Sequence, residues 1–543
     1  MTTTNSASPS HREAWPRLKF GLMLHWGLYS VAGGVWKGRK IPDYNEQIKH
    51  RASIPWDDYH SLCSGFTAAA WDPNAVAQLA TEAGMRYVVI TTKHHEGFNL
   101  WDTKLSSLSA PLATPASRDV LTPLSEACRQ HGLGLGFYYS LIDWYFPGAN
   151  AMSDHNCDPL TPALTTFTCG QLRELLTGYG PLCEIWFDMG KPTVEQSRTI
   201  ADLVHTLQPG CMINGRIWNE QHDFLECHDN EVPDQWFDEP WESAVSMFHE
   251  TWGYRSWQER GQVTDKVHEH VRNLVQVTAH GGNYLLNIGP RGDGSIHEFD
   301  AEVLHGIGAW MRSHGEAIYH GEPEPYVSFS AGCVTSQGQR LWLYLTKPPA
   351  DGIIRVAGWQ TSLPTATVPV NGSIQALACS IIDGDLCILL PATGRDPILT
   401  VITLEHADRN PIQPAGLCHL TNDQPTILTR KNALPWLRMA GSDLATLRKF
   451  VARRTWHVRA PSHGDWSLDV RRVNGGDTTG YVISADSFQT QVLLSETRTA
   501  QQQTCGHLTL HRGQTLRIEL TDIAPGRELV EIGLELVLTR CDT

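Results

Sequence analysis

The chain has 543 residues, of which 41% are hydrophobic and 19% charged, and its formal net charge at pH 7 is −15. This length predicts two or three domains, and the composition is that of an ordered globular protein. The acidic balance and the lack of a long basic run exclude nucleic acid and an anionic membrane as expected partners.

The N-terminal stretch MTTTNSASPSHREAW is polar and contains no apolar segment of the kind found in a signal peptide. No run in the sequence is long and apolar enough to span a bilayer. The 13 cysteines are scattered and form no CxxC pair, which indicates free thiols in a reducing compartment. We therefore expect a cytoplasmic protein whose residues 1–14 form a disordered tail.

Up to about residue 320, segments rich in β-forming residues alternate with segments of helical periodicity. The expected strands cover residues 19–25, 86–90, 132–139, 183–187, 211–214, 246–249 and 283–288. The expected helices cover residues 72–82, 119–131, 193–207 and 264–279. This alternation predicts a parallel sheet, and a (β/α)8-like (TIM) barrel over residues 15–323 fits it best. A doubly wound open sheet is the alternative, but no GxGxxG motif at the first strand–helix turn supports it.

After about residue 325, short β-rich segments separated by turns replace the helices. The expected strands cover residues 341–345, 386–390, 398–402 and 529–538, and one helical pattern covers residues 443–453. We therefore expect two β-sandwich modules, at residues 324–410 and 411–543.

Polar and aromatic side chains follow the ends of successive expected barrel strands. The stretch TTKHHEGFNLWD places Lys93, His94, His95 and Glu96 directly after an apolar run. Other strands end in the motifs HWG, YYS, WFD, NGR and TWGY. In a barrel of parallel strands these ends meet at one mouth, which is where catalytic residues lie. A polar pocket at this mouth explains why a buried strand ends in charged and polar groups.

Each of these residues also has a purely structural explanation, since an Asp after a strand is commonly a helix N-cap. Separate structural roles do not predict that three histidines, an Asp, an Arg and several Trp gather at the same strand ends. A metal site of His25, His94 or His95 with Asp188 is a rival interpretation. Because adjacent residues of a strand point to opposite faces, His94 and His95 chelate one ion only if the strand has already ended. We expect no metal and no cofactor.

The motifs FGLMLHWG, TTKHHEGFNLWD, RDV, GFYYSLIDW, EIWFD, NGR, WGY and GGNYLLNIGPRGDG resemble, in order and spacing, those of the family 29 glycoside hydrolases, the retaining α-L-fucosidases. The resemblance covers about residues 15–320 plus a trailing β-sandwich. It implies a barrel followed by a β-sandwich, and a retaining exo-α-L-fucosidase that releases terminal fucose from fucosylated oligosaccharides or glycoconjugates. Residues 415–543 resemble the extra module of some members, which is often likened to carbohydrate-binding modules.

The resemblance also implies the roles of particular residues. The Asp of the family's Trp-x-Asp motif is the nucleophile, which is Asp188 here. Glu46 matches the Glu of a fucose-binding Glu-Trp pair, but Gln47 replaces the Trp, and Glu96 replaces the Asp of the usual KHHDGF motif. The other residues that the resemblance assigns to fucose binding are His25, His94, His95, Tyr139, Trp186 and Arg216.

The acid/base carboxyl lies in a variable loop of the family, which matches the stretch HDFLECHDNEVP here. Counting back from Val232-Pro233 favours Asp229. The acid/base needs a raised pKa to hold its proton at neutral pH, and a sequence does not show which carboxyl group has one. Glu226, Glu231 and Glu242 therefore remain alternatives.

Two other functions remain open at this point. An α-L-galactosidase on the same scaffold is one, because an apolar pocket rejects an added hydroxyl group only weakly. A non-catalytic fucose-binding protein is the other, since Gln47 removes an aromatic wall. A homo-oligomer is compatible with the sequence.

Overall fold

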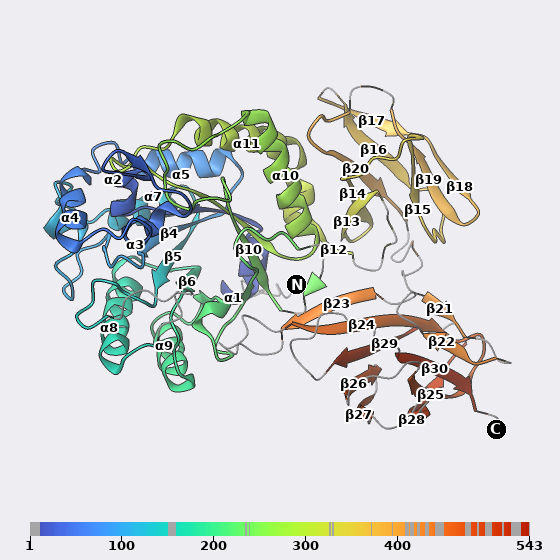
Figure 1. Cartoon of the computed structure of the whole chain (residues 1–543). Helices are drawn as coiled ribbons and strands as arrows, with labels where there is room; N and C mark the ends of the chain where they lie inside the picture. The colour runs from blue at the N-terminus through green and yellow to red at the C-terminus, as the bar shows by residue number, and fades with distance from the viewer. Residues whose placement is uncertain are drawn as a thin grey trace, which may run out of the picture. The chain divides into compact units, whose positions relative to one another are not determined.

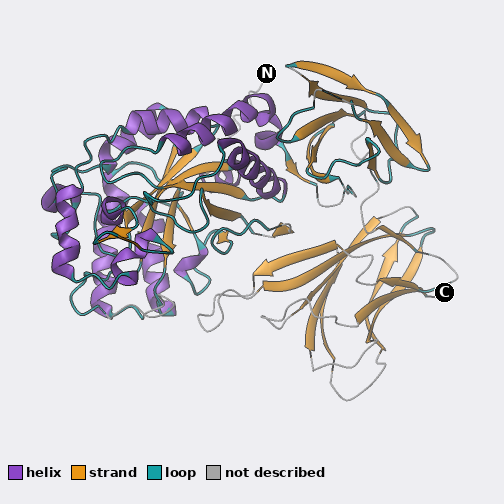
Figure 2. Ribbon diagram, turned by 45° about the horizontal axis from the view of Figure 1, so that its top comes forward, coloured by secondary structure: helices purple, strands orange, loops and turns teal. Residues whose placement is uncertain are grey.

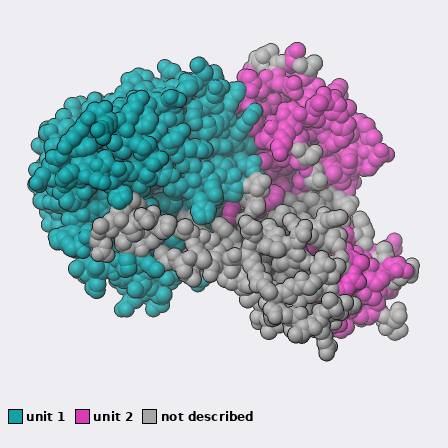
Figure 3. Space-filling model, viewed as in Figure 1, with its two compact units in different colours: residues 1–233, 240–320 teal, residues 234–239, 321–543 magenta. Residues whose placement is uncertain are grey.

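The computed structural model describes most of the chain. It covers residues 11–543 except 150–158, 234–235, 238, 325–326, 328, 330, 371, 392, 394, 408–411, 413–416, 421–423, 429–433, 440–449, 473–478, 486–487, 495–501, 513–514, 523–533 and 542–543. The chain divides into two compact units, and each is described by itself (Figure 3). The first unit comprises residues 11–233 and 240–320 of the described chain, and the second comprises residues 234–239 and 321–543.

An eight-stranded sheet forms the centre of the first unit, and all of its neighbouring strands run parallel. An isolated parallel bridge between Asn214 and Phe224 joins the two outer strands and closes the sheet into a barrel. In sheet order the strands are β7 (Met212–Ile213), β6 (Glu184–Asp188), β5 (Gly134–Ser140), β4 (Tyr87–Lys93), β1 (Phe20–Leu24), β11 (Asn283–Ile288), β10 (Trp241–Ser246) and β8 (Leu225–Glu226).

Almost every residue of these strands is buried, which is typical of a parallel sheet covered on both faces. Figures 1 and 2 show the helices outside the strands of the barrel. The long helices are α5 (Pro73–Glu82), α7 (Leu121–Gln130), α8 (Pro162–Gly178), α9 (Val194–Leu207), α10 (Val263–Ala279) and α11 (Glu298–His320). The TIM-like barrel expected from the sequence is confirmed.

Shorter elements occupy the loops of the first unit. They are α1 (His11–Ala14), η1 (Trp15–Arg17), α2 (Leu28–Ala32), β2 (Val35–Trp36), β3 (Arg39–Lys40), η2 (Asn45–Gln47), α3 (Ile48–Arg51), α4 (Trp56–His60), η3 (Ser61–Gly65), α6 (Ala110–Ala113) and η4 (Gly215–Ile217). Residues 11–14, predicted to be disordered, form α1, which leads into the buried Trp15. The other ten residues of the predicted tail lie outside the described part.

Mainly antiparallel sheets make up the second unit. One group is a six-stranded sheet beside a three-stranded one, around a shared apolar core. Its strands are β12 (Glu322–Pro323), β13 (Gly332–Gln337), β14 (Arg340–Leu345), β15 (Ile353–Val356), β16 (Thr365–Val370), β17 (Ser373–Leu377), β18 (Cys379–Ile382), β19 (Asp385–Leu389) and β20 (Thr400–Glu405).

A seven-stranded and a four-stranded sheet form the other group, around a second apolar core. Its strands are β9 (Trp236–Phe237), β21 (Leu417–His419), β22 (Thr426–Leu428), β23 (Leu434–Met439), β24 (Phe450–Arg459), β25 (Gly464–Arg472), β26 (Thr479–Ala485), β27 (Phe488–Leu494), β28 (Gln502–Leu510), β29 (Thr515–Asp522) and β30 (Leu534–Arg540).

The structure corrects two of the expected elements and adds two long helices. Residues 247–249 are not a strand, because β10 ends at Ser246; its buried Glu242 and Ser243 hid it from a search for apolar runs. The helices α8 and α11 were not predicted. The helical pattern at residues 443–453 is wrong from Phe450, where β24 begins, and its first seven residues lie outside the described part. Among the described residues, no helix is long and apolar enough to cross a membrane.

Candidate active site

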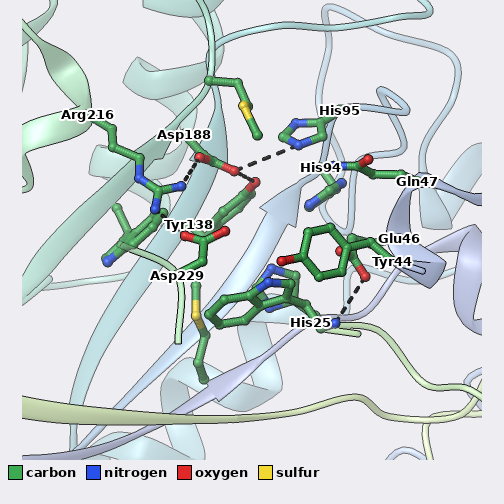
Figure 4. Close-up of a pocket in the computed structure, with 14 residues that line it drawn as sticks. His25, Tyr44, Glu46, Gln47, His94, His95, Tyr138, Asp188, Arg216 and Asp229 are labelled. Atoms are coloured by element: carbon green, nitrogen blue, oxygen red, sulfur yellow. Dashed lines mark hydrogen bonds and ion pairs between the residues drawn. The ribbon is translucent and has the colours of Figure 1, made fainter. Parts of the chain in front are cut away.

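A pocket of about 380 Å³, open to solvent, lies at the C-terminal ends of the barrel strands (Figure 4). Its walls come from β1, β5 and β6, from the loops after β1, β4, β6, β8 and β10, from η2 and the residue before it, and from η4. The lining residues are Met23, His25, Tyr44, Glu46, Gln47, His94, His95, Tyr138, Trp186, Asp188, Met189, Arg216, Asp229 and Trp252.

Asp188, the last residue of β6, is a buried carboxylate of the pocket. Arg216 Nη1 donates to its Oδ1 at 2.5 Å, and the Tyr138 hydroxyl donates to its Oδ2 at 2.5 Å. Burial by itself raises the pKa of Asp188, but Arg216, His95 and Tyr138 together hold this pKa below its ordinary value. Asp188 is therefore ionised at neutral pH and fixed in orientation.

The guanidinium of Arg216 binds two carboxylates of the pocket at once (Figure 4). Its Nη1 pairs with Asp188 and its Nη2 pairs with Asp229, which lies in the loop after β8. The side chain of Asp229 is 33% exposed, whereas that of Asp188 is 8% exposed. The two carboxylates therefore share one cation but differ in their access to water.

The other candidates for the acid/base carboxyl group lie outside the pocket. Glu226 is buried, accepts a hydrogen bond from the backbone N–H of Gly215 at 2.7 Å and lies 3.4 Å from Arg216 Nε. Glu231 is exposed, and Glu242 is buried inside the barrel. None of these three acids lines the pocket, whereas Asp229 does.

The three histidines of the pocket are buried and neutral. Burial lowers the pKa of His25 to about 4 and that of His95 to about 4, although Asp188 raises both. The pKa of His94 is well below its ordinary value, because of burial first and of the neighbouring histidines second. Neutral imidazoles can exchange hydrogen bonds with the hydroxyl groups of a sugar without a desolvated charge.

The other hydrogen bonds of Ser140 and Asn287 determine which ring nitrogen of His95 and of His25 carries the proton. Ser140 Oγ donates to the carbonyl oxygen of Ile142 at 2.9 Å, so it accepts from His95 Nδ1 at 2.7 Å. His95 Nε2 therefore bears a lone pair, and it lies 3.7 Å from Asp188 Oδ2. This lone pair can accept a hydrogen bond from one hydroxyl group of a ligand.

The same reasoning applies to His25. Asn287 Nδ2 donates to Ser246 Oγ and to the carbonyl oxygen of Trp252, so its Oδ1 accepts from His25 Nδ1 at 2.7 Å. His25 Nε2 is then the acceptor nitrogen. The pocket thus offers a hydroxylated ligand at least two acceptor nitrogens, which follow the neighbouring strands β4 and β1.

Glu46 and Gln47 reach the pocket from η2. The backbone N–H groups of Trp252 and Gly253 donate to Glu46 Oε2 at 3.1 and 3.0 Å, and burial raises the pKa of Glu46 to about 7. Gln47 Oε1 accepts from Arg51 Nη2 at 3.3 Å, so its amide nitrogen is the group left to serve as a donor. Gln47 therefore supplies a polar group at the position where the family motif has a Trp.

The structure replaces Tyr139 with its neighbour. Tyr138 lines the pocket and binds Asp188, whereas the Tyr139 hydroxyl donates to Gln171 Oε1 of α8 at 2.7 Å, outside the barrel. Successive side chains of β5 point to opposite faces of the sheet, so only one of the pair can face the barrel interior. The assignment of Tyr139 to the pocket is corrected to Tyr138.

The other sequence-predicted residues all line the pocket: His25, Glu46, His94, His95, Trp186, Asp188, Arg216 and Asp229. Besides Tyr138, the sequence reasoning did not assign Met23, Tyr44, Met189 or Trp252 to it. Met23 lies two residues before His25, Met189 directly follows Asp188, and Trp252 lies in a noted strand-end motif. Proximity in sequence was therefore the available signal for these three.

A metal centre is geometrically open to three of these residues. The ligand atoms of His94, His95 and Asp188 lie within 4.8 Å of one another. β4 ends at Lys93, so both histidines lie beyond the strand, and their ring centroids are 3.9 Å apart. The objection that they point to opposite faces therefore does not hold. A divalent cation would have to compete with the guanidinium already bound to Asp188, so the site better suits a neutral hydroxylated ligand.

The chain is similar to proteins of known activity. Residues 1–316 match the sequence profile of the family described as Alpha-L-fucosidase. Tissue alpha-L-fucosidase of Bos taurus is 30% identical over 395 residues, which are 67% of this chain and 82% of the bovine protein.

Two solved structures share the fold. The alpha-L-fucosidase from Vibrio sp. strain EJY3 has a TM-score of 0.66 at 24% identity, over 97% of each chain. A family 29 alpha-L-fucosidase from Bacteroides thetaiotaomicron, trapped as a covalent intermediate with 2-fluoro-fucosyl fluoride, has a TM-score of 0.65 at 24% identity. That alignment covers 74% of this chain and 98% of the Bacteroides chain.

Proposed function

The chain belongs to the alpha-L-fucosidase family of glycoside hydrolases and is a retaining α-L-fucosidase, and on this premise we propose that Asp188 and Asp229 carry out the two displacement steps. The observation that carries the assignment is the guanidinium of Arg216, which binds both carboxylates. Retaining glycosidases need two carboxyl groups about 5 Å apart. Two carboxylates on adjacent nitrogens of one guanidinium are compatible with that separation.

In the first step, Asp188 attacks the anomeric carbon of the fucosyl group. A bond forms between a carboxylate oxygen and this carbon while the bond to the leaving oxygen breaks, and Asp229 transfers its proton to that oxygen. The lowered pKa of Asp188 keeps the nucleophile ionised, and its burial removes competing water.

In the second step, water attacks the anomeric carbon of the fucosyl ester. Asp229 takes the proton from the water as the ester bond to Asp188 breaks, so the sugar leaves with its original configuration. The 33% exposure of Asp229 is consistent with this role, because the residue must reach both an aglycone and solvent.

The rest of the pocket binds the sugar. His25 and His95 accept from hydroxyl groups through Nε2, and the buried His94 and Glu46 complete the polar side. The face of Trp186 suits the apolar methyl group of a 6-deoxy sugar. We propose that the substrate is a terminal α-L-fucosyl group of an oligosaccharide or glycoconjugate.

The test uses 4-nitrophenyl α-L-fucoside with Asp188→Ala and Asp229→Ala. We expect each variant to lose most of its turnover and each to regain part of it with azide. The Asp188→Ala product is the β-azide, because azide attacks the substrate directly, and the Asp229→Ala product is the α-azide, because azide attacks the fucosyl-enzyme. Unchanged turnover of Asp188→Ala, or the same azide anomer from both variants, contradicts the assignment. The matching α-L-galactoside measures discrimination at the C6 position.

Three further proposals concern the whole chain. The 12 cysteines of the described residues are free, which supports a reducing, cytoplasmic compartment. We also propose that residues 324–410 and 411–543 are separate β-sandwich modules and that the second binds carbohydrate. A homo-oligomer stays a proposal as well, and size-exclusion chromatography with light scattering tests it.

A further inference from the structure

Two carboxyl groups lie inside the barrel below the pocket, and neither takes part in the proposed chemistry. Glu184 and Glu242 are both fully buried. Trp15 Nε1 donates to Glu184 Oε2 at 2.6 Å. The Tyr87 hydroxyl donates to Glu242 Oε2 at 2.6 Å, and Trp186 Nε1 donates to Glu242 Oε1 at 3.1 Å. Burying a carboxyl group costs free energy, and these hydrogen bonds offset part of that cost.

The alternation of side chains along β6 explains how Glu242 is linked to the pocket through Trp186. Along β6, Glu184, Trp186 and Asp188 alternate with Ile185 and Phe187, so these three side chains share the inner face in successive layers. Glu242, on β10, bonds to the middle layer. Trp186 therefore lies between Glu242 and the reacting carboxylate.

Trp186 in turn contacts both groups that hold Asp188. The Arg216 guanidinium carbon lies 4.6 Å from the centroid of the indole, in a cation–π contact. The ring of Tyr138 stacks on the same indole, with centroids 5.7 Å apart and planes 16° apart. A shift of this indole would move the hydrogen-bond donors to both oxygens of Asp188.

We propose that Glu242 is a positioning residue, which fixes the indole of Trp186 so that Arg216 and Tyr138 stay aligned on Asp188. The proposal rests on the function assigned to Asp188 above. The hydrogen bond needs only an acceptor oxygen, which a carboxylate, a carboxylic acid and an amide all provide. The anchor therefore persists whichever protonation state Glu242 adopts.

The test compares Glu242→Leu with Glu184→Leu, a control that removes from the same barrel interior a carboxyl group bonded to Trp15. We expect Glu242→Leu to lower kcat/KM for the aryl fucoside roughly 10- to 100-fold, the cost of one lost alignment. Its acidic limb of kcat/KM should move to higher pH, because Asp188 loses part of the interaction that lowers its pKa. Glu242→Gln should restore both properties, and Glu184→Leu should change thermal stability without moving the limb.

A double-mutant cycle separates positioning from loss of structure. Trp186→Phe removes the indole donor, so adding Glu242→Leu to it should lower kcat/KM no further. Additive effects, or equal pH profiles for Glu242→Leu and Glu184→Leu, would overturn the proposal. If Glu242→Leu does not fold, Trp186→Phe alone must still move the acidic limb. An Asp188→Ala variant that keeps its turnover refutes the proposed function instead, whatever the cycle shows.

Discussion

The protonation state of each residue in this pocket depends on the groups that surround it. Asp188 is buried, yet its pKa stays below the ordinary value because Arg216, His95 and Tyr138 surround it. The histidines are neutral because no carboxylate compensates their burial fully. The pocket thus holds one ionised carboxylate, Asp188, beside uncharged histidine acceptors.

The two adjacent tyrosines of β5 give a matched pair of variants. Tyr138→Phe removes a hydrogen bond to a carboxylate, worth about 1.5–3 kcal/mol, so we expect kcat/KM to fall roughly 10- to 100-fold. Tyr139→Phe removes a neutral bond to Gln171 and should leave kcat/KM nearly unchanged while it lowers the free energy of unfolding by about 1 kcal/mol. Steady-state kinetics and urea unfolding check both. A larger kinetic loss in Tyr139→Phe would return that residue to the pocket.

Glu96 makes stability depend on pH. It accepts from the backbone N–H of Leu28 at 3.0 Å and from the Tyr59 hydroxyl, and burial raises its pKa to about 8. An unfolded glutamate loses its proton near pH 4.5, so between there and pH 8 the folded state binds more protons. The contribution of this group to the free energy of unfolding therefore falls as pH rises through that window.

Glu96→Gln mimics the protonated acid and removes this dependence. Relative to wild type, the free energy of unfolding of the variant should rise by about 1–3 kcal/mol from pH 5 to pH 8. Urea unfolding across this range measures it. The exposed Glu126 supplies the control, because Glu126→Gln should show a flat difference. A flat difference for Glu96→Gln as well would mean that Glu96 ionises freely in the fold.

Among the elements, sequence patterns predicted those whose local signals agree with their packing. Helix α9 begins at a capping box, in which Thr193 accepts from the N–H of Gln196 and Gln196 accepts from the N–H of Thr193. α8 also has a capping threonine, Thr161, and was missed because its apolar periodicity is weaker. β10 was misplaced because its inward glutamate is buried by pairing with other polar groups.

The N-cap of α9 should contribute measurably to the stability of the fold. Thr193→Ala should lower the free energy of unfolding by about 1 kcal/mol, the usual value of an N-cap. Thr193→Ser keeps the cap and serves as the control. Thermal or urea unfolding checks the difference, and kcat/KM should be unchanged because Thr193 does not line the pocket. Equal stability of the two variants would show that the cap contributes nothing to the fold.

At the scale of the whole molecule, stability comes from packing and not from covalent links among the described cysteines. These cysteines are free, and apolar cores in both units hold the sheets together. Burial raises the pKa of several thiols, among them Cys128 to about 12, which keeps them protonated and unreactive.

A reducing agent should therefore leave the protein unchanged. We expect the melting temperature and kcat/KM to be the same with and without dithiothreitol in freshly purified protein. Differential scanning calorimetry and the aryl fucoside assay check this. A fall in melting temperature on reduction would reveal a disulfide and would also argue against the proposed cytoplasmic compartment.

The sequence by itself determined the barrel, the trailing β-sheets, the family, and most of the residues that line the pocket. It could do so because parallel strands of a barrel end at one mouth, so the residues after each strand predict the site before any distance is known. Only the tertiary structure decided between Tyr138 and Tyr139, placed Asp229 rather than Glu226 or Glu231 in the pocket, and revealed Glu242 beneath Trp186. These choices depend on which face of a strand a side chain occupies. They also depend on contacts between residues far apart in sequence, such as the hydrogen bond between Trp186 and Glu242, which are 56 positions apart. No local pattern encodes such contacts.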